Sequence, residues 1–123
     1  AKTLHAFEAL DAPLAGVFGN NDQERHSLDA ACGDLGFFFV DPPLRLHLAD
    51  RPIVVVHDPL DLDGLEVEEG ALLLHGHTHR TTQEWQQGGR LAFNPGECAG
   101  MMRGFNTIGV VDATRLDVEL LKF

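Results

Sequence analysis

The sequence is poor in cysteine, in aromatic residues and in positive charge, and each shortage narrows what the protein can be. Its 123 residues include only two cysteines, which are too few for a disulfide framework and predict a reduced, cytoplasmic protein. Nine Lys and Arg residues against nineteen Asp and Glu give a formal net charge of -10. We therefore expect no stable binding to nucleic acid, because that normally needs a basic face. An acidic protein can still bind a phosphorylated substrate where a bound metal supplies the positive field.

Long apolar stretches and a leader pattern are also missing. The longest apolar runs, such as Ile53–Val56, have the length of a strand and are far shorter than a membrane span. The N-terminus has neither a basic segment nor an apolar segment after it, which predicts no signal peptide and no membrane attachment. A hydrophobic fraction of 44% over 123 residues is enough for the core of one domain, which we expect to span residues 1–123.

The spacing of apolar residues predicts helices early in the chain and strands later. Helices are expected over 2–10 and 22–32, the second with Asp22 as N-cap and Gly33 at its end. Strands are expected over 14–18, 44–48, 53–56, 71–74, 81–86, 90–93, 107–111 and 116–121. Gly88-Gly89 is a strong hairpin signal, and Ala49–Pro52 is expected to form a turn. This order is typical of an α/β sandwich with a mixed sheet.

Polar residues follow four of the apolar strands directly. The ends of these strands are followed by Asn20, by His57, by Gly76–His79 and by Asn94. In open α/β sheets the ligand crevice lies outside the carboxyl ends of the strands, so we expect these four elements to converge there. This repetition is the strongest functional signal in the sequence.

Each candidate ligand also has a plainer explanation. His77 and His79 are two positions apart, which places their side chains on one face of an extended backbone, but a chain with seven histidines can form such a pair by chance. His57 favours a metal in combination with that pair, and is otherwise a neutral core histidine. Asn20 offers an amide oxygen of the kind that suits Mn or Mg, although its surroundings also have the composition of a simple turn. Cys98 has no evident base beside it, and Arg80 and Arg103 are either phosphate contacts or solvated surface residues.

Taken together, the motifs carry a family resemblance. The sequence resembles the calcineurin-like metallophosphoesterase superfamily, and in particular its small bacterial and archaeal phosphodiesterases, in the order of Gly19–Asp22, His57, Gly76–His79 and Asn94–Cys98. The resemblance implies a four-layer αββα sandwich with two divalent metal ions, of which manganese is favoured and nickel, magnesium, iron or zinc are alternatives. It assigns Asn20, His57 and His77 to one ion and His79 to the other, with Asp22 close by as an orienting residue and His77 and Asp22 as the catalytic pair.

The sequence departs from the family pattern at three places. Asn21 stands where many relatives have a histidine that protonates the leaving group, and Asp58 stands where a glycine often follows the histidine. The family opens with a strand ending in Asp-x-His and a second strand ending in Gly-Asp, and neither motif occurs here. The resemblance therefore implies a family member without its first βαβ unit and with only three or four of the ligands.

The function expected from this resemblance is hydrolysis of a small phosphoester, in particular a phosphodiester, by metal-activated water. One alternative is a non-catalytic or structural fragment of that fold that binds one metal weakly or none. Another is a small cupin-like metal protein, because His77, His79 and Glu84 imitate the first cupin motif, but no second motif follows. No loop identifies the natural substrate, and an exposed strand over 14–18 allows pairing between chains.

Overall fold

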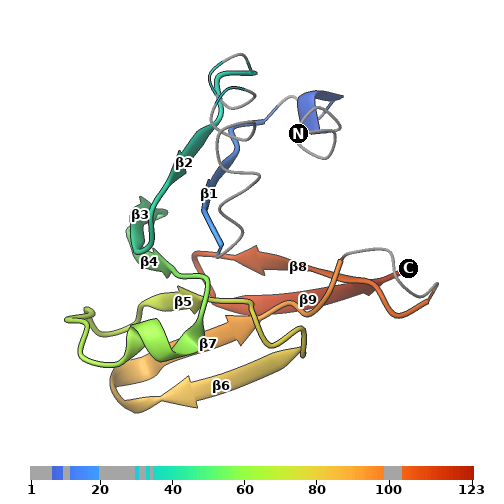
Figure 1. Ribbon diagram of the computed structural model, residues 1–123. Coiled ribbons are helices and arrows are strands. Elements are labelled where there is room, and N and C mark those ends of the chain that lie inside the picture. Colours follow the sequence, from blue (N-terminus) through green and yellow to red (C-terminus); the bar gives the residue numbers. More distant parts are fainter. Residues whose placement is uncertain (1–6, 10–11, 20–29, 31–32, 34, 99–103) are drawn as a thin grey trace.

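The computed structural model describes residues 7–9, 12–19, 30, 33, 35–98 and 104–123. The elements are η1 (Phe7–Ala9), β1 (Ala15–Val17), β2 (Phe38–Val40), β3 (Leu44–Leu48), β4 (Arg51–Val55), η2 (Pro59–Leu62), β5 (Leu72–Leu74), β6 (Thr82–Gln86), η3 (Gln87–Gly89), β7 (Arg90–Asn94), β8 (Thr107–Asp112) and β9 (Asp117–Lys122), as Figure 1 shows. In the described part of the chain, no helix is long and apolar enough to cross a membrane.

A five-stranded mixed sheet in the order β3-β4-β5-β7-β6 forms the body of the molecule. Its centre is parallel, with Val55 of β4 opposite Leu74 of β5 and Leu74 opposite Phe93 of β7. The outer strands β3 and β6 are antiparallel to their neighbours. The central strands are buried on both faces, which is why their sequences are continuous apolar runs rather than alternating ones.

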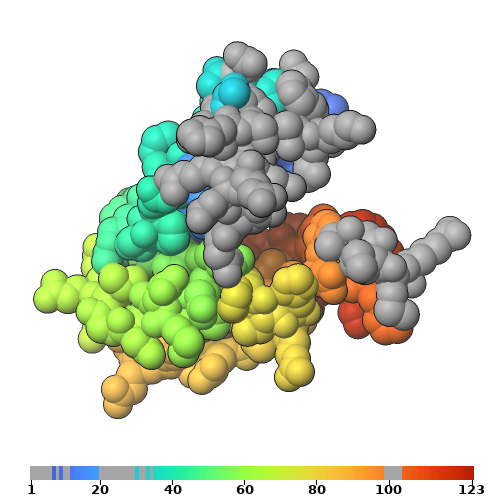
Figure 2. All heavy atoms as spheres, viewed as in Figure 1, coloured from blue at the N-terminus to red at the C-terminus, as the bar shows by residue number. Residues whose placement is uncertain are grey.

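The β8–β9 hairpin packs on one face of this sheet and forms the second β layer (Figure 1). In the space-filling view, its red atoms are partly visible beside the yellow atoms of the main sheet (Figure 2). Its inward residues Val111, Val118 and Leu120 surround a buried cluster that includes Phe93. Gly109 permits the close approach of the two layers, because a Cβ at this position would lie 2.5 Å from the Phe93 ring. The opposite face of the sheet is covered by the segment after β4, through Leu62, Leu65 and Val67.

Two arginine side chains fasten loops to the sheet. Arg51, the first residue of β4, donates to the carbonyl oxygens of Gly70 at 2.6 Å, Ala113 at 2.8 Å and Thr114 at 3.0 Å. It thereby joins the turn of the β8–β9 hairpin to the main sheet. Arg90, at the start of β7, donates to the carbonyl oxygen of Val67 at 2.6 Å and holds the segment that covers the other face.

Several predicted strands are confirmed, with shifted ends. The predicted strand 44–48 is β3, and the hairpin at Gly88-Gly89 is present, with both glycines at positive φ. The predicted turn at Ala49–Pro52 is wrong in extent, because Ala49 and Asp50 at φ 50° and 61° complete the turn, and Arg51 and Pro52 already belong to β4. Proline is tolerated there because Pro52 lies at the start of the strand.

The helical part differs more from the prediction. The predicted helix over 2–10 is represented in the described residues by the short 3₁₀ turn η1. The predicted helix over 22–32 lies mostly outside the described residues, but Gly33 and Leu35 have helical backbone, so Gly33 is not its end. Gly36, at φ 72°, follows the last helical residue instead. Among the described residues there is no helix of seven or more residues, so that part of the chain shows the mixed sheets of the expected αββα sandwich without its helical layers.

Two elements were not expected from the sequence. β2 pairs in parallel with β1, with Gly16 opposite Phe39, and together they form a separate two-stranded sheet. The Phe39 ring packs directly over Gly16, and Leu14, Leu35 and Phe37 gather around it. The 3₁₀ turn η2 follows His57, and Asp58 caps it by accepting a hydrogen bond from the Leu60 N–H at 3.0 Å.

Candidate functional site

The parallel pairing of β4 and β5 continues past both strands and brings their following loops together. The Val56 N–H donates to the Leu74 carbonyl at 2.9 Å, and the Gly76 N–H donates to the His57 carbonyl at 3.0 Å. Two consecutive loops are therefore joined by backbone hydrogen bonds at the carboxyl edge of the sheet. The predicted convergence of polar strand ends is present for His57, for the Gly76–His79 loop and for Asn94, which donates to the Gly76 carbonyl.

His57 and His77 are in direct contact at this edge. The His57 Nε2 and the His77 Nδ1 atoms are 3.0 Å apart, and the two rings meet edge to face at 72° with centroids 4.9 Å apart. Two imidazole nitrogens that bind one ion at about 2.1 Å and at a right angle lie about 3 Å apart, so this separation fits a shared metal. It also fits an N–H···N hydrogen bond between two neutral rings.

Carboxylates lie beside the two histidines of the second loop. The Asp58 Oδ2 atom is 3.7 Å from the His77 Nε2 atom, on the side of the ring away from His57. The Glu97 Oε1 atom is 3.5 Å from the His79 Nδ1 atom. A carboxylate on the far nitrogen of an imidazole is the usual outer partner of a metal-binding histidine, because it fixes the ring orientation. Asp58 lies on that side of the His77 ring, at 3.7 Å, which is longer than a hydrogen bond.

The chain segment that leads to Asn20 also reaches this edge. A Cβ added at Gly19 would lie 3.2 Å from the His57 Cε1 atom and 3.3 Å from its Nδ1 atom, so the Gly19 backbone lies against the His57 ring. Asn20 is the next residue, and both Asn20 and Asp22 lie outside the described residues. The structure brings His57 and His77 together and leaves the predicted positions of Asn20 and Asp22 untested.

The predicted common face of His77 and His79 is wrong. Both residues have positive φ, 68° and 60°, so the backbone is a tight turn rather than an extended strand. The Thr78 N–H donates to the Gly76 carbonyl at 2.8 Å and closes that turn. Consequently His77 faces His57 while His79 lies near Glu97, and the rule for alternating side chains does not apply here.

Asn94 has a role that the sequence did not predict. It is the last residue of β7, is fully buried, and donates through Nδ2 to the Gly76 carbonyl at 3.2 Å and to the Thr78 Oγ1 atom at 3.1 Å. Its Oδ1 atom accepts from the Gly96 N–H at 2.9 Å. A buried asparagine directly before Pro95-Gly96 was the available signal, but burial cannot be read from composition.

His75 is a half-buried histidine directly after β5, two residues before His77. Burial lowers its pKa below the usual 6.5, and smaller opposing effects come from the Gly76 backbone, Glu84 and Asp58. Its Nδ1 atom is buried and finds no hydrogen-bond partner among the described residues, so the Gly76 contact does not satisfy that atom. Neutral imidazole is therefore the favoured form of this side chain in the folded chain.

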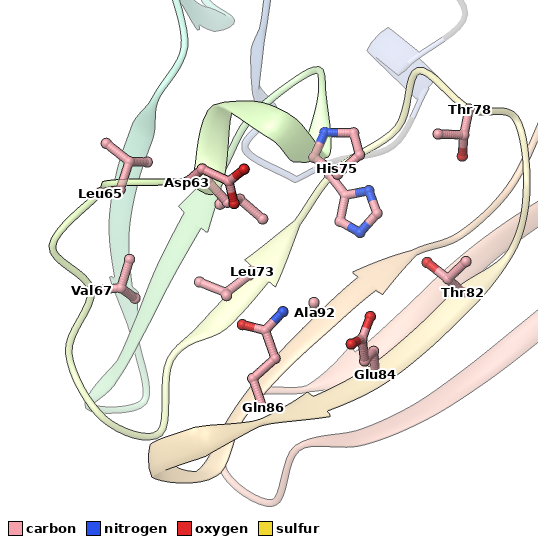
Figure 3. Close-up of a pocket in the computed structure, with 12 residues that line it drawn as sticks. Asp63, Leu65, Val67, Leu73, His75, Thr78, Thr82, Glu84, Gln86 and Ala92 are labelled. Carbon is pink, nitrogen blue, oxygen red and sulfur yellow. The ribbon is translucent and has the colours of Figure 1, made fainter.

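Cavities border the loops among the described residues, and two of them include candidate site residues or their neighbours. A cavity of about 370 Å³ lies on the covered face of the sheet and is lined by His75, Glu84 and apolar residues such as Leu73 and Ala92 (Figure 3). A smaller one of about 280 Å³ includes His57, Gly19 and Asp58. The smaller cavity is the better candidate for substrate, because it contains one of the two converging histidines and the larger contains neither.

The described side chains supply only some of the nitrogen and oxygen ligands that a divalent ion needs. Within the described residues, no group of three or more His, Cys, Asp and Glu side chains is close enough together to hold a metal ion. The converging nitrogen pair therefore offers two ligands, and further ones would have to come from groups such as the Asn20 amide. Cys98 is exposed, as is Arg80, and Arg103 lies outside the described residues.

Comparison with known proteins agrees with the arrangement of the strands and motifs. Residues 1–115 match the calcineurin-like phosphoesterase superfamily domain. The chain is 29% identical over 116 residues to phosphodiesterase MJ0936 of Methanocaldococcus jannaschii, covering 91% of this chain and 69% of that protein.

Solved structures show the same fold. A structure described as a novel archaeal phosphodiesterase superposes with a TM-score of 0.81 at 27% identity, covering 99% of this chain and 76% of the other. The phosphoesterase YfcE of E. coli superposes with a TM-score of 0.61 at 20% identity, covering 98% and 69%. Because the family match spans nearly the whole chain and the sheets superpose on those of the archaeal protein, this chain belongs to the calcineurin-like phosphoesterase superfamily.

Proposed function

We propose that this protein is a metal-dependent phosphodiesterase that acts on small phosphoesters. The observation that carries the proposal is the 3.0 Å approach of His57 Nε2 and His77 Nδ1 at the carboxyl edge of a parallel sheet. Membership of a phosphoesterase superfamily and the likeness to phosphodiesterase MJ0936 support the same reaction class.

In this proposal His57, His77 and Asn20 hold one divalent ion and His79 contributes to a second, with manganese as the favoured metal. Such ions, when bound, supply Lewis acidity toward a phosphate oxygen and a lowered pKa for water. Asp58 orients the His77 ring through its far nitrogen, and Gly19 leaves the space that the His57 ring needs. Asp22 is proposed as an orienting residue close to the ions.

The charges around the site explain why the metal matters. Asp41, Asp58 and Asp61 line the smaller cavity, so the protein by itself presents negative charge to an incoming phosphate. Bound dications reverse that local field, whereas the net charge of -10 still disfavours a long polyanion. We therefore propose a small phosphoester as substrate rather than duplex nucleic acid.

The test is hydrolysis of bis(p-nitrophenyl) phosphate with added Mn²⁺, compared between the unaltered protein and His77→Ala. We expect the substitution to lower kcat/KM by at least about a hundredfold, because losing even an outer partner of a metal ligand costs up to that factor. His47→Ala is the matched control, since His47 is an exposed residue of β3 beside Glu68 and distant in the fold from the strand ends. Normal hydrolysis by His77→Ala would contradict the metal assignment.

A second function, a non-catalytic domain that binds one metal weakly or none, is favoured by a specific observation. In the part of the chain that the structure describes, the His57 and His77 nitrogens lie 3.0 Å apart, but no group of three or more His, Cys, Asp and Glu side chains could hold an ion. Metal analysis and the phosphodiester assay on the same sample distinguish the two functions. Two tightly bound metals per chain with turnover support the phosphodiesterase, and one weakly bound metal without turnover supports the second function.

A further inference from the structure

The Asn94 side chain joins the loops that follow β5 and β7. The side chain is 0% exposed and its hydrogen bonds reach the loop after β5, at Gly76 and Thr78, and the loop after β7, at Gly96. A buried amide with donors and acceptor all satisfied holds its neighbours rigidly, because breaking any of these bonds would leave a polar group without a partner.

The two contacts with the loop after β5 are on either side of His77. Asn94 binds the carbonyl of the preceding residue, Gly76, and the side chain of the following residue, Thr78. His77 itself has φ 68°, a left-handed conformation that is unfavourable for a residue with a Cβ. Such a conformation persists only where the surrounding structure holds it, and Asn94 is the buried side chain that does so here.

We propose that Asn94 is a positioning residue for the candidate metal site. By fixing the backbone on both sides of His77, it directs the His77 Nδ1 atom toward the His57 Nε2 atom. The inference rests on the proposed function only for the part that says this nitrogen pair binds a metal. The effect of Asn94 on the orientation of the His77 ring does not depend on a metal. Among the described residues, the hydrogen bonds of the Asn94 side chain go to Gly76, Thr78 and Gly96, so Asn94 acts on His77 through Gly76 and Thr78.

Two variants test the proposal by changing either partner of the hydrogen bond between Asn94 and Thr78. Asn94→Asp keeps the acceptor for the Gly96 N–H and replaces the donor by an oxygen that faces the Gly76 carbonyl. Because Asn94→Asp places a carboxylate in a fully buried site and can impair folding, Thr78→Val is the second variant. Thr78 is exposed, and valine removes its hydroxyl while keeping its shape. Thr78→Ser restores the hydroxyl, and Thr82→Val makes the same change at an exposed residue of β6.

Two readouts are needed besides activity. Mn²⁺ affinity is measured by calorimetry, and the contact between the His57 and His77 rings is measured by nuclear Overhauser effects in the metal-free protein. We expect Asn94→Asp and Thr78→Val to weaken Mn²⁺ binding about tenfold or more and to reduce the ring contact, as losing an outer-shell partner does. Thr78→Ser and Thr82→Val should keep both at the level of the unaltered protein.

The outcomes separate this inference from the proposed function. Unchanged Mn²⁺ affinity and ring contact in folded Thr78→Val and Asn94→Asp, with only a lower melting temperature, would show a purely structural role and overturn the inference. An unaltered protein that binds Mn²⁺ but hydrolyses no phosphodiester would overturn the proposed function, while the affinity comparison among variants still tests Asn94. If the unaltered protein binds no Mn²⁺, the ring contact alone decides.

Discussion

At the scale of single residues, Gly19 matters because it has no side chain to occupy the space beside the His57 ring. A methyl group at Gly19 would lie 3.2 Å from the His57 Cε1 atom, which is closer than comfortable van der Waals contact. The His57 ring or the chain at Gly19 must then move by a few tenths of an ångström. The His57 and His77 nitrogens are only 3.0 Å apart. A small displacement of the His57 ring therefore changes the distance and angle at which the two nitrogens can bind one ion.

We therefore expect Gly19→Ala to weaken Mn²⁺ binding about tenfold while changing the stability of the protein little. Binding is measured by calorimetry and stability by urea unfolding. Gly33→Ala is the matched control, because a Cβ at that helical position would meet no atom within 4 Å among the described residues outside its own helix and its chain neighbours. Equal Mn²⁺ affinity in the two variants would show that the close contact with His57 does not matter.

The half-buried His75 makes stability depend on pH. Its pKa in the folded chain is lowered from 6.5 by burial, so below pH 6.5 the unfolded chain takes up a proton that the folded chain does not. This contribution to stability is fully present above pH 6.5 and is lost progressively as the pH falls toward the lowered pKa. Below the lowered pKa both states are protonated and the loss stops.

The free energy of unfolding should therefore fall less steeply with decreasing pH in His75→Gln than in the unaltered protein. The difference in slope should correspond to less than one proton per chain. The measurement is urea unfolding between pH 7.5 and 5 in the presence of a chelator, so that metal binding does not contribute. His47→Gln serves for comparison, because His47 is exposed on β3. A decline as steep in His75→Gln as in the unaltered protein would contradict the account.

At the scale of elements, Arg51 connects parts of the chain that are distant in sequence. Its guanidinium group donates to the carbonyl oxygens of Gly70, Ala113 and Thr114, which belong to the loop before β5 and to the β8–β9 turn. The planar fork of arginine can reach all three oxygens at once, whereas the single ammonium group of lysine cannot. The second β layer is thus fastened to the main sheet at one end by a single side chain and along its length by apolar packing.

Arg51→Ala should lower the free energy of unfolding by about 2 kcal/mol, because charged donors to backbone carbonyls contribute more than neutral ones. Arg51→Lys should recover only part of that loss, and both are measured by urea unfolding. Arg45→Ala, at an exposed position on β3, should remain within about 0.5 kcal/mol of the unaltered protein. A loss no larger for Arg51→Ala than for Arg45→Ala would show that the three hydrogen bonds are not stabilising.

At the scale of the whole molecule, the candidate ligands come from separate strands of one sheet. His57 follows β4 and His77 follows β5, so a metal that binds both restrains two loops that unfolding would release. A ligand that binds only the folded chain stabilises it by mass action, by about 2.7 kcal/mol at a concentration a hundred times its dissociation constant.

Saturating Mn²⁺ should accordingly raise the melting temperature of the unaltered protein and leave that of His57→Ala nearly unchanged. Differential scanning calorimetry with and without Mn²⁺ provides the measurement, with His47→Ala expected to behave as the unaltered protein. An equal upward shift in His57→Ala would place the stabilising ion elsewhere in the molecule.

The sequence by itself determined those features that depend on neighbouring residues. Apolar runs such as Val54–Val56 and Leu72–Leu74 predicted buried strands, and the residues that follow them predicted that His57 would meet the Gly76–His79 loop. The meeting of His57 and His77 was predictable because parallel neighbours end at the same edge of a sheet. Gly88-Gly89 similarly predicted its hairpin, because a local turn depends on local backbone freedom.

Only the tertiary structure decided the features that depend on distant contacts. The pairing of β2 with β1 rests on Phe39 packing over Gly16, twenty-three positions earlier in the chain, which no local pattern contains. The left-handed backbone at His77 and the burial of Asn94 depend on each other, since the amide that holds the loop comes from a different strand. Sequence spacing placed His77 and His79 on one face, and the long-range hydrogen bonds of Asn94 to Gly76 and Thr78 turned them apart.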